Sequence, residues 1–331
     1  MLIAIDDQSQ IAASRRTAEA LARNGGFDEL RASRLGLIAT EMASNILKHA
    51  TRGHLVAARF ADGTGTGIEL LAMDKGPGIG DVARALEDGY STAGTPGTGL
   101  GAIRRQADIF DIYSRPGAGT VVMVRILANE DRAGGVAADC ELGMVLVPYP
   151  GEVECGDSWA FGLKSGAPSL FAVDGSGHGP QAALAARGAV EAFEKSDQMD
   201  SVRVMETVHR ALAPTRGAAT AVARVDRPAQ LVRFSGIGNI AGALISNGAI
   251  KRMVSLNGTA GHVAPRLREF TYPYNGAATV ILHSDGLSAK WDVATYPGLA
   301  SCRPSVIAGV LSRDFRRTND DSMVAVLRVA A

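Results

Sequence analysis

Acidic residues in the second half of the chain stand next to apolar runs that are typical of β-strands. Asp157 precedes such a run, Asp174 and Asp285 each follow one, and the pair Asp320 and Asp321 precedes the last. Each aspartate alone is commonly a turn former or a helix cap. If the strand ends meet at one edge of a sandwich, the carboxylates converge. A carboxylate cluster without Cys or His selects hard divalent ions, Mg²⁺ or Mn²⁺.

Two such ions, about 3.5–4 Å apart, would activate a shared water and hold a phosphoryl group in line for attack. Gly175 directly follows Asp174 and permits a backbone carbonyl to turn inward as a further ligand. This chemistry needs no covalent nucleophile, and the sequence has neither C-x5-R nor G-x-S-x-G.

In the first half, an acidic and an amide side chain are spaced by one helical turn. Glu41, Asn45 and His49 recur at intervals of four residues, so a helix would place them along one stripe. Glu41 and Asn45 could share a hydrated Mg²⁺ ion, and Glu41 could accept a proton from an attacking hydroxyl. The same spacing also fits a solvated helix face without a chemical role.

A glycine-rich segment, "DKGPGIGD", follows the predicted strand "IELLAM". Its first residue, Asp74, could accept a hydrogen bond from a nucleobase amino group, and Gly76 and Gly78 would let the backbone approach a flat ring. A second cluster, "GTGLG", leads into a predicted helix. Its residues Gly97, Gly99 and Gly101 would present backbone N–H groups to phosphates. The segment is therefore predicted to be the lid and cradle of an ATP site.

Hydrophobic periodicity predicts the elements that position these residues. Leu35, Ile38, Met42 and Ile46 form an apolar stripe, which predicts an amphipathic helix over residues 34–50. Two β-like runs around the turn "ADGTGT" predict a hairpin. We expect the first half to be an α/β sandwich with helices on one face of a mixed sheet.

The second half contains many short β-like runs, interrupted by helical stretches over residues 181–195 and 202–212. A two-sheet β-sandwich flanked by helices accounts for this order, and the fold class is α+β. The polar segment "NEDRAGGVAAD" separates the halves. We predict an ATP-binding domain over residues 1–128, a linker over 129–138 and a second domain over 139–331.

The composition excludes several classes of protein. Lys+Arg and Asp+Glu each number 34 among 331 residues, and no basic run with interleaved aromatics occurs, so no nucleic-acid or membrane partner is expected. The three cysteines, Cys140, Cys155 and Cys302, lack CxxC spacing and fit reduced thiols. Neither a signal peptide nor a run of 18 apolar residues is found, which predicts a cytoplasmic protein.

The ordered motifs E-x-x-x-N, D-x-G-x-G and G-x-G-x-G resemble the GHKL ATP-binding fold of gyrase, Hsp90, histidine kinases and MutL. Within that group, residues 1–127 are most similar to the small bacterial serine/threonine kinases of the RsbT type, which act as anti-sigma factors and stress switches. The resemblance implies that Glu41 is the catalytic base, Asn45 the Mg²⁺ ligand and Asp74 the adenine contact. It also implies that the stretch between the glycine clusters is the lid.

In the second half, "DGSGHG" and "SDGL", supported by "GIGN", resemble the PPM-type metal-dependent serine/threonine phosphatases of the bacterial SpoIIE and RsbX subgroup. The resemblance runs from about residue 140 to the end. It implies that Asp174 bridges both metals, that the Gly175 carbonyl is a ligand, that Asp285 and Asp320 complete one metal, and that Asp157 serves the other. The ending "DDSM" departs from the common D-[DN]-x-[TS], because Met323 replaces a hydroxyl residue. His178 is interpreted as a structural turn residue.

Together these resemblances predict a bifunctional switch, in which ATP and Mg²⁺ serve a kinase domain and two Mn²⁺ or Mg²⁺ ions serve the phosphatase that reverses it. The expected partner is a STAS-domain anti-anti-sigma or stressosome-type protein, and through it a sigma factor or another regulator. Two alternatives remain. The first domain could hold ATP only to bind a partner, or its nucleotide could gate the phosphatase, in both cases without kinase activity.

Overall fold

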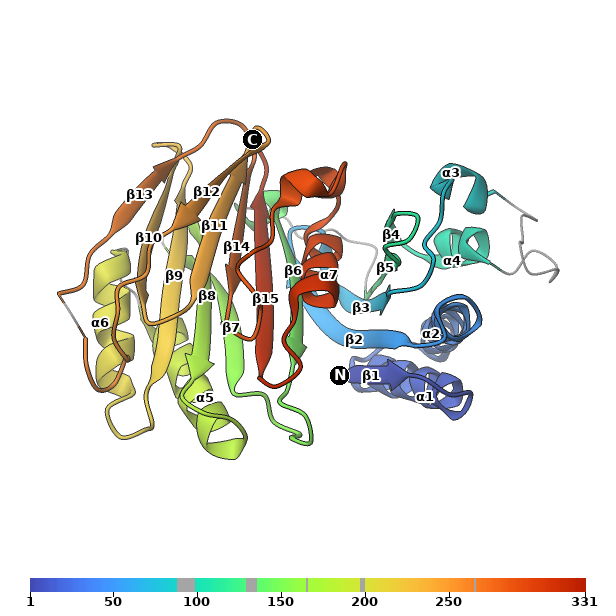
Figure 1. Cartoon of the computed structure of the whole chain (residues 1–331), viewed down its shortest axis with the longest axis horizontal. Coiled ribbons are helices and arrows are strands. Elements are labelled where there is room, and N and C mark those ends of the chain that lie inside the picture. Colours follow the sequence, from blue (N-terminus) through green and yellow to red (C-terminus); the bar gives the residue numbers. More distant parts are fainter. Residues whose placement is uncertain (88–98, 129–135, 165, 197–199, 265) are drawn as a thin grey trace. The chain divides into compact units, whose positions relative to one another are not determined.

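The computed structural model describes residues 1–87, 99–128, 136–164, 166–196, 200–264 and 266–331 (Figure 1). The chain forms two compact units. The first contains Met1–Ala133 together with Ser301–Arg313, and the second contains Gly134–Ala300 together with Asp314–Ala331. A short segment from the range expected for the second domain therefore belongs to the first unit.

The first unit is built on one five-stranded sheet with the order β1-β2-β3-β5-β4. Every described pairing in it is antiparallel, so the expectation of a mixed sheet was wrong. Hairpins join β2 to β3 and β4 to β5, whereas helices lie in the chain between β1 and β2 and between β3 and β5. An N-terminal strand that the sequence did not predict pairs with β2. The strands are β1 (Leu2–Ile5), β2 (Gly53–Asp62), β3 (Gly65–Asp74), β4 (Ile109–Ser114) and β5 (Thr120–Leu127).

One face of this sheet is covered by helices. They are α1 (Ser9–Asn24), α2 (Glu29–Ala50) and α4 (Leu100–Gln106), with the single turn α3 (Val82–Ala85) in the loop after β3. Asp28 caps α2 by accepting a hydrogen bond from the Arg31 backbone N–H at 2.7 Å. The predicted apolar stripe of α2 is buried against the sheet, which confirms the amphipathic interpretation.

The opposite face of the sheet is apolar as well, because alternate side chains of β3 and β5 point there. Leu71 and Val121 are fully buried on that face. They contact α7 (Pro304–Phe315) at Gly309, where an added Cβ would lie 2.9 Å from Val121 Cγ1 and 3.3 Å from Leu71 Cδ2. The residues of α7 from Pro304 to Ser312 are buried, and most of them are apolar.

A buried ionic network lies between the sheet and α7. Arg125 donates from Nε to Glu69 at 2.6 Å and from Nη1 to Asp62 at 2.9 Å, while its guanidinium stacks on Phe60. Ser305 of α7 donates to the same Glu69 oxygen at 2.6 Å. Burial raises the pKa of the Glu69 carboxyl, and the charge of Arg125 and the hydroxyl of Ser305 oppose that rise. The network therefore ties α7 to the strands by polar contacts that depend on one another.

The second unit consists of two five-stranded antiparallel sheets, as the predicted β-sandwich requires. Their orders are β13-β10-β9-β8-β7 and β12-β11-β14-β15-β6. The first contains β7 (Asp157–Lys164), β8 (Ala167–Gly175), β9 (Ala218–Asp226), β10 (Leu231–Ile237) and β13 (Phe270–Pro273). The second contains β6 (Cys140–Val147), β11 (Ala241–Ser246), β12 (Ala249–Met253), β14 (Ala278–His283) and β15 (Ser322–Val329).

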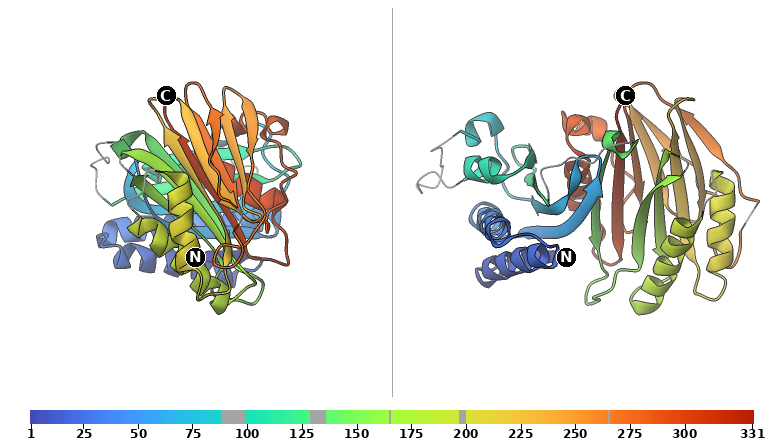
Figure 2. Two further views of the ribbon diagram at one scale, coloured as in Figure 1. Left: turned by 90° about the vertical axis from the view of Figure 1, so that its left-hand side faces the viewer. Right: turned by 180° about the vertical axis from the view of Figure 1, so that it is seen from behind.

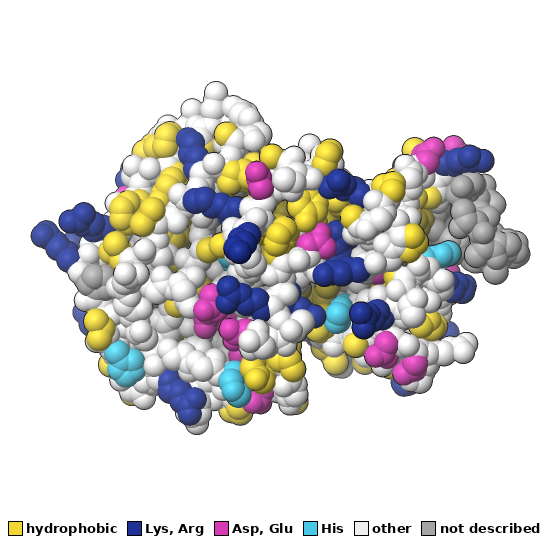
Figure 3. Space-filling view, in the orientation of Figure 1, with side chains coloured by type: hydrophobic (Ala, Val, Ile, Leu, Met, Phe, Trp, Pro, Cys, Tyr) yellow, Lys and Arg dark blue, Asp and Glu magenta, His cyan; other side chains and the backbone are white. Residues whose placement is uncertain are grey.

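The two sheets of this unit enclose an apolar core, and a second core lies under two helices. These helices, α5 (Pro180–Lys195) and α6 (Ser201–Ala211), run along the outer face of one sheet (Figure 2). The α+β class and the sandwich flanked by helices are thus confirmed. On the face drawn in Figure 3, basic and acidic side chains are interspersed, as the balanced composition predicts. None of the described helices combines the length and the apolar character needed to span a membrane.

Arg125→Met should lower the free energy of unfolding of the first unit by about 3–5 kcal/mol, because it leaves two carboxylates buried without their cation. Urea unfolding followed by circular dichroism measures the loss. Arg15→Met is the matched control, since Arg15 pairs with Glu19 at the surface and its loss should cost less than about 1 kcal/mol. Equal losses in the two variants would contradict a structural role for the network.

Candidate functional sites

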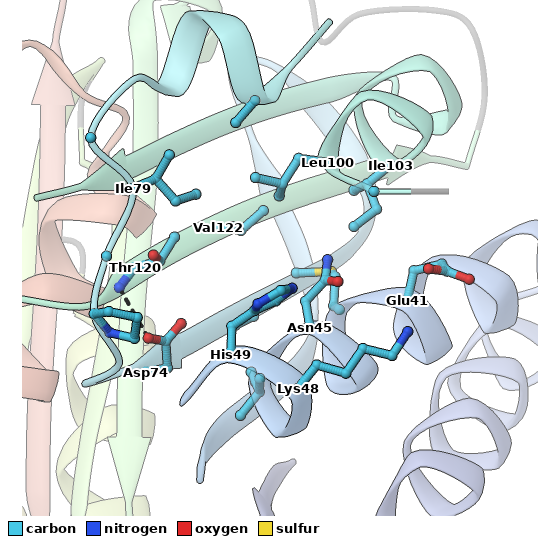
Figure 4. A pocket seen from close by; sticks show the side chains of 18 of the residues that line it. Glu41, Asn45, Lys48, His49, Asp74, Ile79, Leu100, Ile103, Thr120 and Val122 are labelled. Atoms are coloured by element: carbon cyan, nitrogen blue, oxygen red, sulfur yellow. Dashed lines mark hydrogen bonds between the residues drawn. The ribbon is translucent and has the colours of Figure 1, made fainter. Parts of the chain in front are cut away.

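The first unit contains a cavity of about 350 Å³ (Figure 4). Its wall is formed by one face of α2, the end of β3, the loop after β3, the start of α4 and part of β5. Of the residues predicted for the ATP site, five line it: Glu41, Asn45, Asp74, Gly78 and Gly99. The fold thus brings together residues from three motifs that are separated in the sequence.

Helix α2 supplies the polar wall of this cavity. Glu41, Asn45 and His49 all line it, one turn apart, while the apolar stripe of the same helix faces the core (Figure 4). Glu41 and Asn45 are half-buried and His49 is exposed. A carboxylate, an amide and an imidazole are therefore available to one bound ligand.

Asp74 ends β3 at the base of the cavity. Its Oδ1 accepts hydrogen bonds from the backbone N–H groups of Gly76 at 2.8 Å and Thr120 at 3.3 Å (Figure 4). Burial raises the pKa of the Asp74 carboxyl, and these two bonds act against the rise, as do the positive charges of Arg313 and His49. The side chain is thus held in one orientation by the backbone around it.

Two of the predicted glycines are required by close backbone packing. A Cβ on Gly78, whose φ is +69°, would lie 1.9 Å from the Arg115 carbonyl oxygen. A Cβ on Gly76 would lie 2.7 Å from Ala50 Cβ. Gly76 does not line the cavity, so the structure gives this residue a role in shaping the loop after β3.

The second glycine cluster is described only in part. Gly99 is the N-cap residue of α4 and lines the cavity, whereas Gly101 is buried within the helix. Gly97 and most of the stretch predicted to be the lid lie in 88–98, outside the described residues.

Sequence reasoning missed several residues of the cavity wall, among them Lys48 and Thr120. Lys48 lies on the same stripe of α2, three residues after Asn45, and adds a positive charge. Thr120 begins β5 beside Asp74. The helical spacing from Asn45 was a signal for Lys48, but only the pairing of β3 with β5 reveals Thr120. The opposite wall is apolar and includes Ile79, Leu100, Ile103 and Val122 (Figure 4).

In the second unit, Asp157 and Asp174 are direct cross-strand partners on β7 and β8. Burial raises the pKa of both carboxyls, that of Asp174 to about 7. The next causes for Asp174 are the negative charges of Asp285, Asp320 and Asp321. The aspartates predicted from the strand ends therefore do gather at one end of the unit, close enough to repel one another.

Hydroxyl and amide groups connect this cluster to the second sheet. Ser284 Oγ donates to Asp157 Oδ2 at 2.5 Å and accepts from the Met323 backbone N–H at 3.0 Å. Asn239 Nδ2 donates to Asp285 Oδ2 at 2.6 Å, which explains the place of "GIGN" among the motifs. In the described chain, no three of these carboxylates already surround one point as metal ligands. Two of them are instead turned towards these hydrogen-bond donors.

One carboxylate oxygen of the cluster remains without a partner among the described residues. Asp321 is buried, and its Oδ1 accepts the Tyr149 backbone N–H at 2.7 Å, but its Oδ2 has no hydrogen bond. An unpartnered buried carboxylate oxygen next to other acids fits a divalent cation. The sequence had favoured Asp320 of this pair; the structure adds Asp321 as a candidate ligand.

Gly175 follows Asp174 in a tightly packed position. Its backbone N–H donates to the Gly156 carbonyl at 3.0 Å, and a Cβ would lie 2.3 Å from the Ala182 carbonyl oxygen. Glycine is therefore required here by the approach of α5.

The loop after Asp174 also lies beside an arginine that the sequence did not reveal. A Cβ on Gly177 would lie 3.4 Å from Arg216 Nη1. Arg216 is exposed and, among the described residues, forms no ion pair. His178, in the same loop, stacks on Tyr149 and lies 3.2 Å from Glu152, which agrees with a structural role.

Comparison with known proteins gives two family matches. The model of the histidine kinase-like ATPase domain matches residues 5–126, and that of Stage II sporulation protein E (SpoIIE) matches residues 164–329, which is half of the chain. The serine/threonine-protein kinase RsbT of Bacillus subtilis (strain 168) is 35% identical over 112 residues, which cover 34% of this chain and 84% of RsbT.

Solved structures that are similar to the chain include the following two. One, described as "The bacterial stressosome: a modular system that has been adapted to control secondary messenger signaling", is 30% identical with a TM-score of 0.53, and the match covers 57% of this chain and 98% of the other. The other is RsbX in complex with magnesium, 18% identical with a TM-score of 0.50, covering 58% and 96%. At this level of identity, the similarity to RsbX shows only that the matched part of the chain has the same fold.

These matches agree with the two sites described above: a nucleotide-type cavity in the first unit and a carboxylate cluster in the second. The chain therefore belongs to the SpoIIE family of PPM-type serine/threonine phosphatases and carries an RsbT-type serine/threonine kinase domain of the histidine kinase-like ATPase fold ahead of the phosphatase domain.

Proposed function

We propose that the protein is a bifunctional signalling switch, which phosphorylates and dephosphorylates a serine or threonine of a STAS-type partner that controls a sigma factor or a stress output. The observation that carries the proposal is the presence of both sites in one chain, each with its acidic residues gathered. The similarity to RsbT and to a stressosome protein supports this class of partner.

In the first site, ATP would supply the phosphoryl group with ADP as the leaving group, and Mg²⁺ would neutralise the phosphate charge. Glu41 would accept the proton of the attacking hydroxyl, Asn45 would hold the metal, and Asp74 would accept a hydrogen bond from the adenine amino group. The apolar wall opposite receives the base. Gly78 and Gly99 line the part of the wall formed by the loop after β3 and the start of α4.

In the second site, bound Mn²⁺ or Mg²⁺ supplies Lewis-acid activation of water and of the phosphoryl group. Asp157, Asp174, Asp285, Asp320 and the Gly175 carbonyl would hold the ions, with Asp321 as a further ligand. Ser284 and Asn239 orient two of these carboxylates. Arg216, which lies beside the loop after Asp174, would contact the substrate phosphate.

Asp74→Asn should weaken ATP binding by roughly 10- to 100-fold, since the adenine amino group loses a charged acceptor worth about 1.5–3 kcal/mol. Titration calorimetry on the full chain measures the change. Asp81→Asn is the control, because Asp81 lines the same cavity but caps α3, a task that asparagine performs equally well. Wild-type affinity in Asp74→Asn would remove Asp74 from the nucleotide site.

Removal of divalent metal by a chelator should abolish hydrolysis of an aryl phosphate, and Mn²⁺ or Mg²⁺ should restore it. Asp321→Asn should weaken Mn²⁺ binding, measured by calorimetry, because a buried carboxylate loses its charge. The exposed helix cap Asp292 offers the control, Asp292→Asn, which should bind Mn²⁺ as the wild type does. Metal-independent hydrolysis would contradict the two-metal assignment.

A paired time course tests whether the two activities oppose each other. With ATP and each STAS protein encoded nearby, Asp174→Asn should accumulate phosphosubstrate to near completion, because phosphatase activity falls by orders of magnitude while the kinase is intact. Glu41→Ala should add no phosphate, yet still clear pre-phosphorylated substrate. The wild type should settle at a partial level.

Phosphopeptide mapping identifies the modified residue in the same samples. If Asp174→Asn gains no more phosphate than the wild type on any STAS protein, opposed activities on one substrate are excluded. A partner-binding module or a nucleotide-gated phosphatase would then describe the chain better.

A further inference from the structure

The nucleotide cavity lies next to an element from the far end of the sequence. Residues Ser301–Arg313, which include most of α7, belong to the first unit. Asp74, the predicted adenine contact, and Arg313, near the end of α7, are neighbours in that unit although 239 residues separate them.

Arg313 acts on Asp74 in two ways. Its Nη1 donates to the Asp74 carbonyl oxygen at 3.5 Å, at the long end for a hydrogen bond. Its charge also stabilises the ionised form of the Asp74 carboxyl, against the effect of burial. His49 of α2 acts on this carboxyl in the same direction, and Lys48 of α2 and Asp81 of the loop after β3 line the same cavity.

Contacts at the start and the middle of α7 hold the helix that carries Arg313. Just before the helix, the Arg303 backbone N–H donates to Asp111 Oδ2 at 2.6 Å. In its first turn, Ser305 joins the buried network of Arg125 and Glu69. At its middle, Gly309 allows close approach to the sheet. The Arg313 guanidinium therefore lies beside Asp74 on a helix that these contacts hold against the sheet.

We propose that Arg313 is a positioning residue of the nucleotide site, which holds the end of β3 so that the Asp74 carboxylate meets the adenine amino group. The inference rests on the proposed nucleotide-binding role of Asp74. It assigns to the ATP site a residue that the sequence places among the elements of the phosphatase half.

This role links nucleotide binding to the phosphatase half through the chain itself. Asp320 follows Arg313 by only seven residues. If Arg313 favours the nucleotide-bound state, nucleotide must in turn favour the docked position of α7, because such coupling is reciprocal.

The experiment compares ATP with a purine nucleoside triphosphate that lacks the 6-amino group, each titrated into the full chain by calorimetry. Arg313→Gln should weaken ATP binding by about three- to tenfold, and should leave binding of the analogue within twofold of the wild type. Arg313→Lys should restore most of the ATP affinity, since it returns the positive charge. Ser305→Ala is the control on the same helix and should lower the unfolding temperature without changing the ATP-to-analogue ratio.

The outcomes separate this role from the rest of the proposal. Unchanged ATP affinity in Arg313→Gln, or equal losses for ATP and the analogue, would overturn the role of Arg313 while leaving the nucleotide site in place. A change in the ATP-to-analogue ratio in Ser305→Ala as large as that in Arg313→Gln would also overturn it, because general loosening of α7 would then suffice. A wild-type chain that binds no ATP would overturn the nucleotide site itself.

Discussion

Asp157 and Asp174 occupy paired positions on β7 and β8, so two carboxylates are held side by side where little water reaches them. Asp285, Asp320 and Asp321 add negative charge at the same place. Gathering such groups is costly, because each buried charge without a partner loses several kcal/mol of solvation. The hydrogen bonds between neighbouring strands within the sheet nonetheless hold Asp157 and Asp174 at these positions. A divalent cation would turn this repulsion into attraction, so the stability and the chemistry of this end of the unit would depend on the same ion.

In the first unit, one helix, α2, holds the polar side chains of the cavity in place. The apolar stripe of α2 anchors it to the sheet, and the polar stripe of the same helix forms the wall of the cavity. A shift of α2 that exposed its apolar residues would also displace Glu41 and Asn45. The free-energy cost of exposing the apolar stripe therefore helps to keep Glu41 and Asn45 at the wall of the cavity.

Much of both sites could be predicted because the decisive signals were local. The spacing on α2, the acid that ends β3 and the aspartates at strand ends each follow from periodicity along a few residues. Thr120, Asp321 and Arg216 could not be found in this way. Thr120 meets Asp74 only because β3 pairs with β5. Asp321 differs from Asp320 in having a buried oxygen without a partner. Arg216 lies beside the loop after Asp174, although some forty residues separate the two in the sequence. The antiparallel order of the first sheet was likewise set by pairings between distant segments.

The position of α7 on the first unit could not be predicted either, because the sequence of a mostly apolar helix does not indicate which sheet it packs against. Its placement has a consequence for the order in which the protein is made. The first unit is complete only once residue 313 has been synthesised. By then every strand of the second unit except β15 has been synthesised. The first unit therefore cannot be completed before nearly all of the second unit has been made.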